Sequence, residues 1–293
     1  MKQCILSILI LLSACSKNES EPKSRLITFG QPQPVTINGY SADIMEPFFA
    51  SNGETLFFNN SNHPSVNTNL HFAKRINDIT FEYQGELKGV NSESLNGVAT
   101  MDNSNTFYFV STRSYNQTLA TIYTGKFEND SISNITLVSG ISKNLVGWVN
   151  FDVEVSKNGN FLYFVDGRFD ENGGPYQADI AIAEKTDAGF QRISPDLLKN
   201  INTSALEYAA CLSSDMLELY FTRVDAPISE TSMPKIYVST RESMSEPFRK
   251  PYRIEMIDGF VEAATISPNN QTIYYHKLEG QKYVLYMVRK EAE

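Results

Sequence analysis

Histidine and cysteine are scarce in this 293-residue chain, which has three of each. The histidines, His63, His71 and His276, are scattered and show no metal-ligand spacing. The acidic stretch DGRFDENGG, residues 166–174, lacks the residue order of a calcium-binding loop. The sequence also has no glycine-rich phosphate loop and no Gly-x-Ser-x-Gly nucleophile elbow. We therefore expect no bound metal and no cofactor.

Positive charge is also in short supply. The chain has 25 Lys and Arg against 34 Asp and Glu, a formal net charge of −9. Because nucleic-acid binding needs a basic surface, this balance argues against a nucleic-acid partner. No linker interrupts residues 26–293, so we expect a single domain there. Aromatic residues make up 12% of the chain, mostly Phe and Tyr, which favours strands.

The early apolar run CILSILILL, residues 4–12, is too short to span a bilayer as a permanent helix. It follows Lys2 and leads into the small residues of LSAC, which ends at Cys15. This pattern is typical of a cleaved signal peptide. The order Leu-Ser-Ala-Cys resembles the lipobox of bacterial lipoproteins. The resemblance implies that residues 1–14 are removed and that Cys15 is lipidated; a plain secretory signal is the alternative.

The lipoprotein resemblance also implies a location. It predicts a membrane partner, held through the lipid on Cys15, in the bacterial cell envelope. Ser16 after the cysteine favours the outer membrane, facing either the periplasm or the outside. Residues 15–25 are polar and read as the lipidated cysteine with a flexible tether. Cleavage would leave Cys211 as the remaining free thiol, in an apolar strand where we expect a core residue, so no disulfide is predicted.

A repeated pattern runs through the rest of the chain. The stretches SNGETLFF, DNSNTFYFV, SKNGNFLYFV, SSDMLELYFT and SPNNQTIYYH each join a polar turn to an aromatic strand. Aligned on Phe58, Phe109, Phe164, Phe221 and Tyr275, they recur at steps of 51, 55, 57 and 54 residues. A period of this length with four strand-like segments per unit is the pattern of propeller blades. We predict five blades, each with a small apolar innermost strand.

The fifth unit ends after its third strand, which leaves an edge without a partner. The segment 27–37 fits there, because its Phe29-x-x-Pro32 matches Phe248-x-x-Pro251 in the fourth strand of the preceding unit. The prediction is thus an all-β, single five-bladed β-propeller over residues 26–293. The N-terminal strand completes the last blade, and we expect a monomer.

Two stretches carry a family resemblance. ISPNNQTIYYHK and KIYVSTRESMSEPFRKPYRI resemble the TolB-type, WD-like propeller repeat of many periplasmic proteins and lipoproteins. The resemblance covers essentially the whole chain after Cys15 and implies the fold. It implies no single activity, because propellers host unrelated functions. The family's Ser-Pro-Asp-Gly turn is poorly kept: only Pro268 retains the proline and only Asp215 the aspartate.

The predicted blades gather polar side chains at one mouth of the ring. Innermost strands begin on the face where second strands end, because neighbouring strands are antiparallel. The ligand-binding candidates there are Glu46, Trp148, Asp152, Arg168, Glu207, Tyr208, Arg223, Glu262 and Lys277, with Asn96 and Arg113 at the matching places in the second unit. His276 lies near the same face.

These residues leave three interpretations open. The carboxylates would lock blades together by bonding to backbone or to an Arg of the next blade, since buried charges need partners. Alternatively, they form a polar pocket that binds a protein, peptide or glycan. The third interpretation is a glycosidase-like hydrolase. Five-bladed glycosidases of the arabinanase type use three carboxylates, and Asp152, Glu207 and Glu262 would be the catalytic candidates here.

Overall fold

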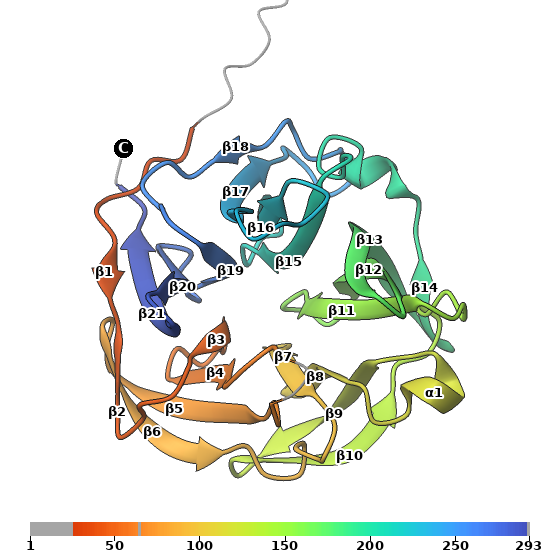
Figure 1. Cartoon of the computed structure of the whole chain (residues 1–293), viewed down its shortest axis with the longest axis horizontal. Helices are drawn as coiled ribbons and strands as arrows, with labels where there is room; N and C mark the ends of the chain where they lie inside the picture. The colour runs from red at the N-terminus through yellow and green to blue at the C-terminus, as the bar shows by residue number, and fades with distance from the viewer. Residues whose placement is uncertain (1–25, 64–65, 292–293) are drawn as a thin grey trace, which may run out of the picture.

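The computed structural model describes residues 26–63 and 66–291. Five sheets stand in a ring around one axis, as Figure 1 shows, so the prediction of an all-β, five-bladed propeller is confirmed. The proposed signal peptide, Cys15 and the tether lie outside the described residues. No helix in these two ranges is long and apolar enough to cross a membrane.

In each blade, strands that follow one another in the chain pair antiparallel, from the innermost strand outward. The innermost strands are β3 (Met45–Phe49), β7 (Asn96–Met101), β11 (Trp148–Val155), β15 (Leu206–Leu212) and β19 (Val261–Ile266). The second strands are β4 (Thr55–Asn59), β8 (Thr106–Ser111), β12 (Phe161–Asp170), β16 (Glu218–Val224) and β20 (Thr272–Glu279). The third are β5 (Leu70–Asn77), β9 (Ile122–Glu128), β13 (Gly173–Thr186), β17 (Lys235–Thr240) and β21 (Lys282–Arg289). Four of the blades are completed by an outer strand, namely β6 (Thr80–Glu86), β10 (Ser131–Leu137), β14 (Gly189–Arg192) and β18 (Tyr252–Arg253). Connecting segments contain two short helices, α1 (Tyr115–Thr118) and the 3-10 helix η1 (Pro195–Leu198).

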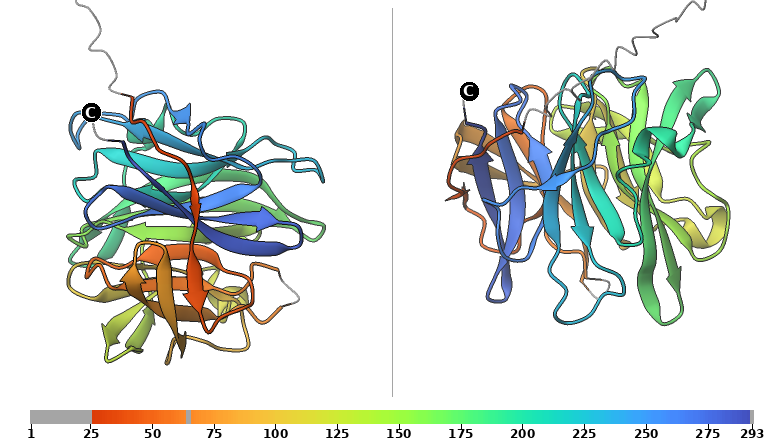
Figure 2. Two further views of the ribbon diagram at one scale, coloured as in Figure 1. Left: turned by 90° about the vertical axis from the view of Figure 1, so that its left-hand side faces the viewer. Right: turned by 90° about the horizontal axis from the view of Figure 1, so that it is seen from above.

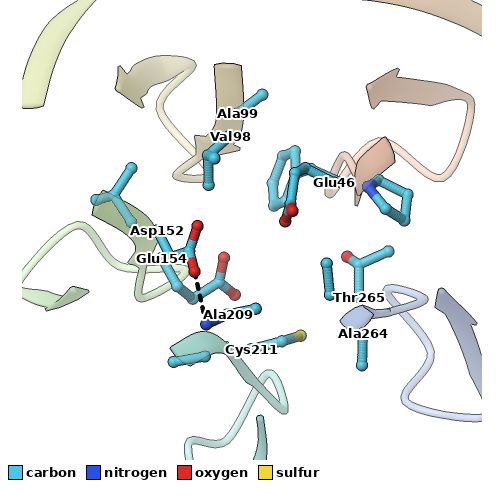
Figure 3. A pocket seen from close by; sticks show the side chains of 14 residues that line it. Glu46, Val98, Ala99, Asp152, Glu154, Ala209, Cys211, Ala264 and Thr265 are labelled. Atoms are coloured by element: carbon cyan, nitrogen blue, oxygen red, sulfur yellow. Dashed lines mark hydrogen bonds between the residues drawn. The ribbon is translucent and has the colours of Figure 1, made fainter. Parts of the chain in front are cut away.

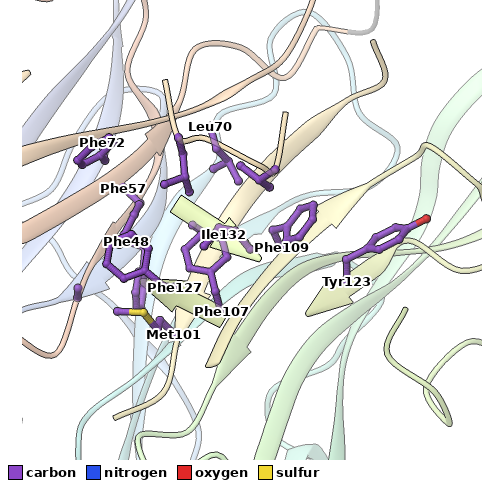
Figure 4. Packing of buried hydrophobic residues seen from close by; sticks show 14 residues of the cluster. Phe48, Phe57, Leu70, Phe72, Met101, Phe107, Phe109, Tyr123, Phe127 and Ile132 are labelled. Atoms are coloured by element: carbon purple, nitrogen blue, oxygen red, sulfur yellow. The ribbon is translucent and has the colours of Figure 1, made fainter. Parts of the chain in front are cut away.

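The aromatic second strands form the core between blades. Because both faces of a blade are covered by its neighbours, these strands are buried continuously rather than on alternate residues. All five residues of β4 are buried. Figure 4 shows Phe57 of the first blade beside Phe107 and Phe127 of the second, with Phe57–Phe107 centroids 5.2 Å apart. Each fully buried Phe side chain stabilises the fold by roughly 1.5–3 kcal/mol.

The N-terminal segment closes the ring. Strand β1 (Gln33–Pro34) pairs antiparallel with β21, and Phe29 bridges to Lys290, so the predicted completion of the last blade is confirmed. The pairing of the next strand was not predicted from the sequence. Strand β2 (Thr36–Asn38) pairs in parallel with β6, which gives the first blade a fifth strand. One continuous segment therefore ties the last blade to the first.

The two faces of the ring differ in what they carry. We call the face where innermost strands begin the mouth face. Figure 2 (right) shows the hairpins between second and third strands extending toward this face, at the bottom of the view. The N-terminal segment enters from the other side: Gly30 and Glu291 donate backbone hydrogen bonds to Arg289 and Thr28 where β21 ends, at 2.9 Å each. Residues 28–30 thus lie at the opposite face.

Candidate functional site

The innermost strands share an irregularity that positions the site. In every blade the pairing between first and second strand shifts at one point. A non-glycine residue with positive φ, between 47° and 54°, lies at each shift: Glu46, Val98, Asp152, Ala209 and Ala263. Residues other than glycine rarely adopt this left-handed backbone conformation. The packing of five innermost strands around the axis therefore imposes it. The bulge breaks the two-residue alternation of each strand.

The bulge places the predicted carboxylates at different levels along the axis. Glu46 and Asp152 are the bulge residues themselves, Glu262 lies one residue before its bulge, and Glu207 lies two before. The predicted carboxylates therefore occupy different positions relative to the bulges of their strands. Glu154, two residues after Asp152, adds a further level toward the opposite face.

Glu207 belongs to an ion pair inside its own blade. Its fully buried carboxylate accepts from Arg223 Nε at 2.7 Å and from the backbone N–H and hydroxyl of Thr203 at 3.0 and 2.6 Å. Arg223 also donates to the Ile201 carbonyl at 2.7 Å and stacks on Tyr237. These contacts satisfy the carboxylate, but the arginine belongs to the same blade rather than to the next one.

The second blade repeats this arrangement without a charge on the strand. Asn96, at the level of Glu207, accepts from Arg113 Nη2 at 2.8 Å. Arg113 stacks on Phe109 and Tyr123, as Arg223 does on Phe221 and Tyr237. The repetition indicates that the polar pairs at this level stabilise individual blades, rather than contacts between neighbouring blades.

A second group, the axial cluster, brings together residues of four blades at the mouth. It consists of Glu46, Asp152, Tyr208, Glu262 and His276. The Tyr208 hydroxyl donates to Glu262 Oε1, and His276 Nε2 lies 3.2 Å from Glu262 Oε2. The backbone N–H of Glu46 donates to His276 Nδ1 at 3.2 Å, so Nδ1 accepts and Nε2 carries the proton toward Glu262.

Burial governs the protonation of the axial carboxylates. It raises the pKa of Glu46 well above its ordinary value, and the charges of Asp152 and Glu262 raise it further, against a 2.8 Å hydrogen bond from Asn62. Burial likewise raises the pKa of Asp152 to about 7, although the Ala209 N–H, 2.9 Å away, opposes the shift. The pKa of Glu154 is raised by burial in the same direction. None of these three carboxylates forms an ion pair with a Lys or Arg of residues 26–63 and 66–291.

The carboxylates surround a small axial cavity. Figure 3 shows Glu46, Asp152 and Glu154 pointing toward the axis, among small side chains such as Ala99 and Ala264. The cavity has a volume of about 30 Å³. A water molecule needs roughly 10–15 Å³ by this measure, so the space suits one or two waters and is too small for a sugar ring.

The remaining predicted residues have contacts outside the axial cluster. Trp148 opens β11, and Lys143 Nζ lies 3.3 Å from its ring centroid, so one face of the indole is covered. Arg168 is exposed and pairs in register with Trp148 on the second strand. Lys277 lies opposite Val261, 3.8 Å from Glu279 and stacked on Tyr286. In the described ranges no group of three or more His, Cys, Asp or Glu side chains is arranged to hold a metal.

Three members of the site were missed or only partly predicted. Glu154 carried a signal, because it alternates with Asp152 within an apolar innermost strand. His276 was placed at the mouth face, but its contacts with Glu46 and Glu262 were not predicted. Asn62, which donates to Glu46, comes from a loop of the first blade and carried no signal in the sequence.

Similar solved structures include enzymes and a TolB protein. The catalytic domain of a GH62 α-L-arabinofuranosidase from Coprinopsis cinerea aligns over 90% of this chain and 97% of its own, with TM-score 0.58 and 11% identity. A protein assigned as an exo-β-1,3-galactanase from Bifidobacterium bifidum s17 aligns over 91% and 94%, with TM-score 0.57 and 11% identity. A protein assigned as TolB from Agrobacterium tumefaciens aligns over 88% and 78%, with TM-score 0.50 and 11% identity.

Sequence comparison adds nothing to these structural matches: no family model and no curated protein matches the chain. Identities of 11% show a shared propeller fold and no more. Glycoside hydrolases and a protein assigned as TolB both occur among the structural neighbours, so the shared fold alone assigns no activity to this chain.

Proposed function

We propose that this chain is a lipid-anchored β-propeller of the bacterial cell envelope that binds a protein, peptide or glycan at its mouth face. The supporting observation is that the chain entry and the long hairpins lie on opposite faces of the ring. The chain enters at the opposite face, near residues 28–30, whereas the long hairpins extend at the mouth face. A lipid on Cys15 and a tether of residues 16–25, which spans at most about 35 Å, would leave the mouth face directed away from the membrane.

The anchor is tested by replacing the cysteine. In cells expressing the full chain, Cys15→Ser should move the protein from the membrane fraction to the soluble fraction and abolish incorporation of labelled palmitate. The substitution Ser16→Ala is the control and should leave both unchanged. Membrane association that persists in Cys15→Ser would contradict lipid anchoring.

The binding face is tested by photocrosslinking in intact cells. A photoreactive amino acid is placed at Arg168, Tyr176 or Ile228 on the mouth face, or at Glu54 or Asp187 in hairpins of the opposite face. All five side chains lie at the surface, so each substitution should fold. We expect discrete crosslinked products from the mouth-face positions alone. Products that form equally from both faces would contradict the assignment.

A hydrolase is the second candidate, and one observation favours it. The pKa of Asp152 is raised to about 7, as a general acid requires, but the adjacent cavity is too small for a sugar ring. We expect no release of nitrophenol from 4-nitrophenyl α-L-arabinofuranoside or β-D-galactoside between pH 5 and 8. Release that falls by about a hundredfold or more in Asp152→Asn would replace the binding proposal with hydrolysis.

A further inference from the structure

Two neighbouring loops give the mouth face a distinct chemical character. The first, residues 168–177, is the tip of the β12–β13 hairpin and includes the ends of both strands; the second, residues 225–234, joins β16 to β17. We call them the acidic hairpin pair. They belong to adjacent blades, since β12 and β13 both contact β15. Figure 2 (right) shows both extending to the mouth face.

We infer that the acidic hairpin pair docks a polypeptide segment that presents basic and apolar side chains. The inference deepens the proposed function and rests on it, because it gives the class of partner for the mouth face. It narrows the three ligand classes of that proposal to one.

The charge of the hairpin pair selects a basic partner. Its acidic residues Asp170, Glu171, Asp225 and Glu230 are all exposed, and Arg168 is its one cation, so the two loops carry a net charge of −3. Within residues 26–63 and 66–291, none of the four forms an ion pair. Asp170 is held instead by the Asn172 N–H at 2.8 Å and the Tyr176 hydroxyl at 3.1 Å. These carboxylates therefore remain available to a cation from outside.

The centre of the same face contributes little to this charge, because burial raises the pKa values of Glu46 and Asp152 and so favours their neutral forms. The negative charge lies on the exposed acids of the rim, where it attracts cations over several ångströms and repels partners of the same sign. Nucleic acids and anionic lipid surfaces are thereby disfavoured.

The apolar side chains of the hairpin pair select a polypeptide rather than a sugar. Tyr176, Ile228 and Met233 are 51%, 53% and 46% exposed, one on the first loop and two on the second. Sugars stack on planar aromatic rings, whereas Ile and Met side chains offer no plane. Flexible Met is common on surfaces that bind varied peptides. A segment with Lys or Arg beside aliphatic or aromatic residues satisfies both features.

The test uses a displayed library of random 12-residue peptides, selected on the full chain. We expect enrichment of peptides with two or more Lys or Arg and at least two large apolar residues. Binding of the selected peptides should weaken about tenfold or more between 50 and 300 mM NaCl, because exposed charges are screened. Enrichment of neutral or acidic peptides would overturn the inference.

Matched variants then locate the contact. Binding of the selected peptides should weaken by about tenfold or more in a variant that combines Asp170→Asn, Glu171→Gln, Asp225→Asn and Glu230→Gln. The control neutralises four exposed acids at the opposite face: Glu54→Gln, Glu128→Gln, Glu184→Gln and Asp187→Asn. It changes the net charge equally and should leave affinity within about twofold. Equal loss in both variants would reduce the effect to net charge and overturn the inference.

The apolar contribution is measured with Ile228→Ser and Met233→Ser, which should weaken binding by a further tenfold or so without changing the salt dependence. An unchanged affinity would remove the apolar part of the inference. The two proposals fail separately. Mouth-face crosslinking in cells without selection of basic peptides would retain the binding function and reject its basic polypeptide partner; absence of both would reject both.

Discussion

Asp152→Asn should make the propeller more stable at pH 8 and change its stability little below pH 4. Burial raises the pKa of Asp152 from 3.8 to about 7, so the folded state holds a proton that the unfolded chain releases near pH 4. Between about pH 4 and pH 7 the folded state binds more protons than the unfolded state, so the free energy of unfolding falls as the pH rises. A shift of about three units corresponds to at most roughly 4 kcal/mol, reached above pH 7.

The asparagine is well matched to this position. Asp152 has φ of 49°, a conformation that Asn tolerates, and the Asn side-chain oxygen can still accept from the Ala209 N–H. The free energy of unfolding is measured by urea titration at half-unit steps from pH 4 to 8. Asp187→Asn, at an exposed turn, is the control and should follow the wild type. If the free energies of unfolding of the wild type and Asp152→Asn differ by the same amount at pH 4 and at pH 8, Asp152 does not hold a proton in the folded state.

The fold was predictable because it depends on a pattern repeated five times. Each second strand joins a polar turn to a run such as LFF, FYFV or LYFV, and each run is buried on both sides by neighbouring blades. The missing fourth strand of the last blade pointed to the N-terminal segment, and β1 occupies that place. The pairing of β2 with β6 depends on where the chain turns after Val35, which no repeat specifies.

The candidate site was predicted less well, because a bulge sets the direction of its side chains. A strand pattern assumes two-residue alternation, and one inserted residue sends every later side chain to the other face. Glycine would have marked the bulge, but Val98, Ala209 and Ala263 occupy it in three blades. Glu207 was grouped with Asp152 as a candidate at the mouth, but it lies two residues before its own bulge and pairs with Arg223.

Arg223→Met should destabilise the protein by about 3–5 kcal/mol, because it leaves the Glu207 carboxylate buried without its cation. The Glu207 side chain is 0% exposed and that of Arg223 17%, so solvent screens this ion pair little. Two Thr203 hydrogen bonds remain, which satisfy oxygens but do not neutralise the charge. The free energy of unfolding from urea titration at pH 7 measures the loss.

A second substitution separates the charge from the packing. Glu207→Gln combined with Arg223→Met removes the buried charge and keeps an oxygen for Thr203, so we expect the double variant to lose less than Arg223→Met alone. Arg249→Met is the matched control, because the Arg249–Glu242 pair is more exposed, at 31% and 59%, and such pairs contribute about 1 kcal/mol or less. If Arg223→Met lowers the free energy of unfolding no more than Arg249→Met does, the Glu207–Arg223 ion pair does not stabilise the fourth blade. If the double variant is the least stable of the three, the stacked guanidinium of Arg223, rather than the buried charge, is what the fourth blade requires.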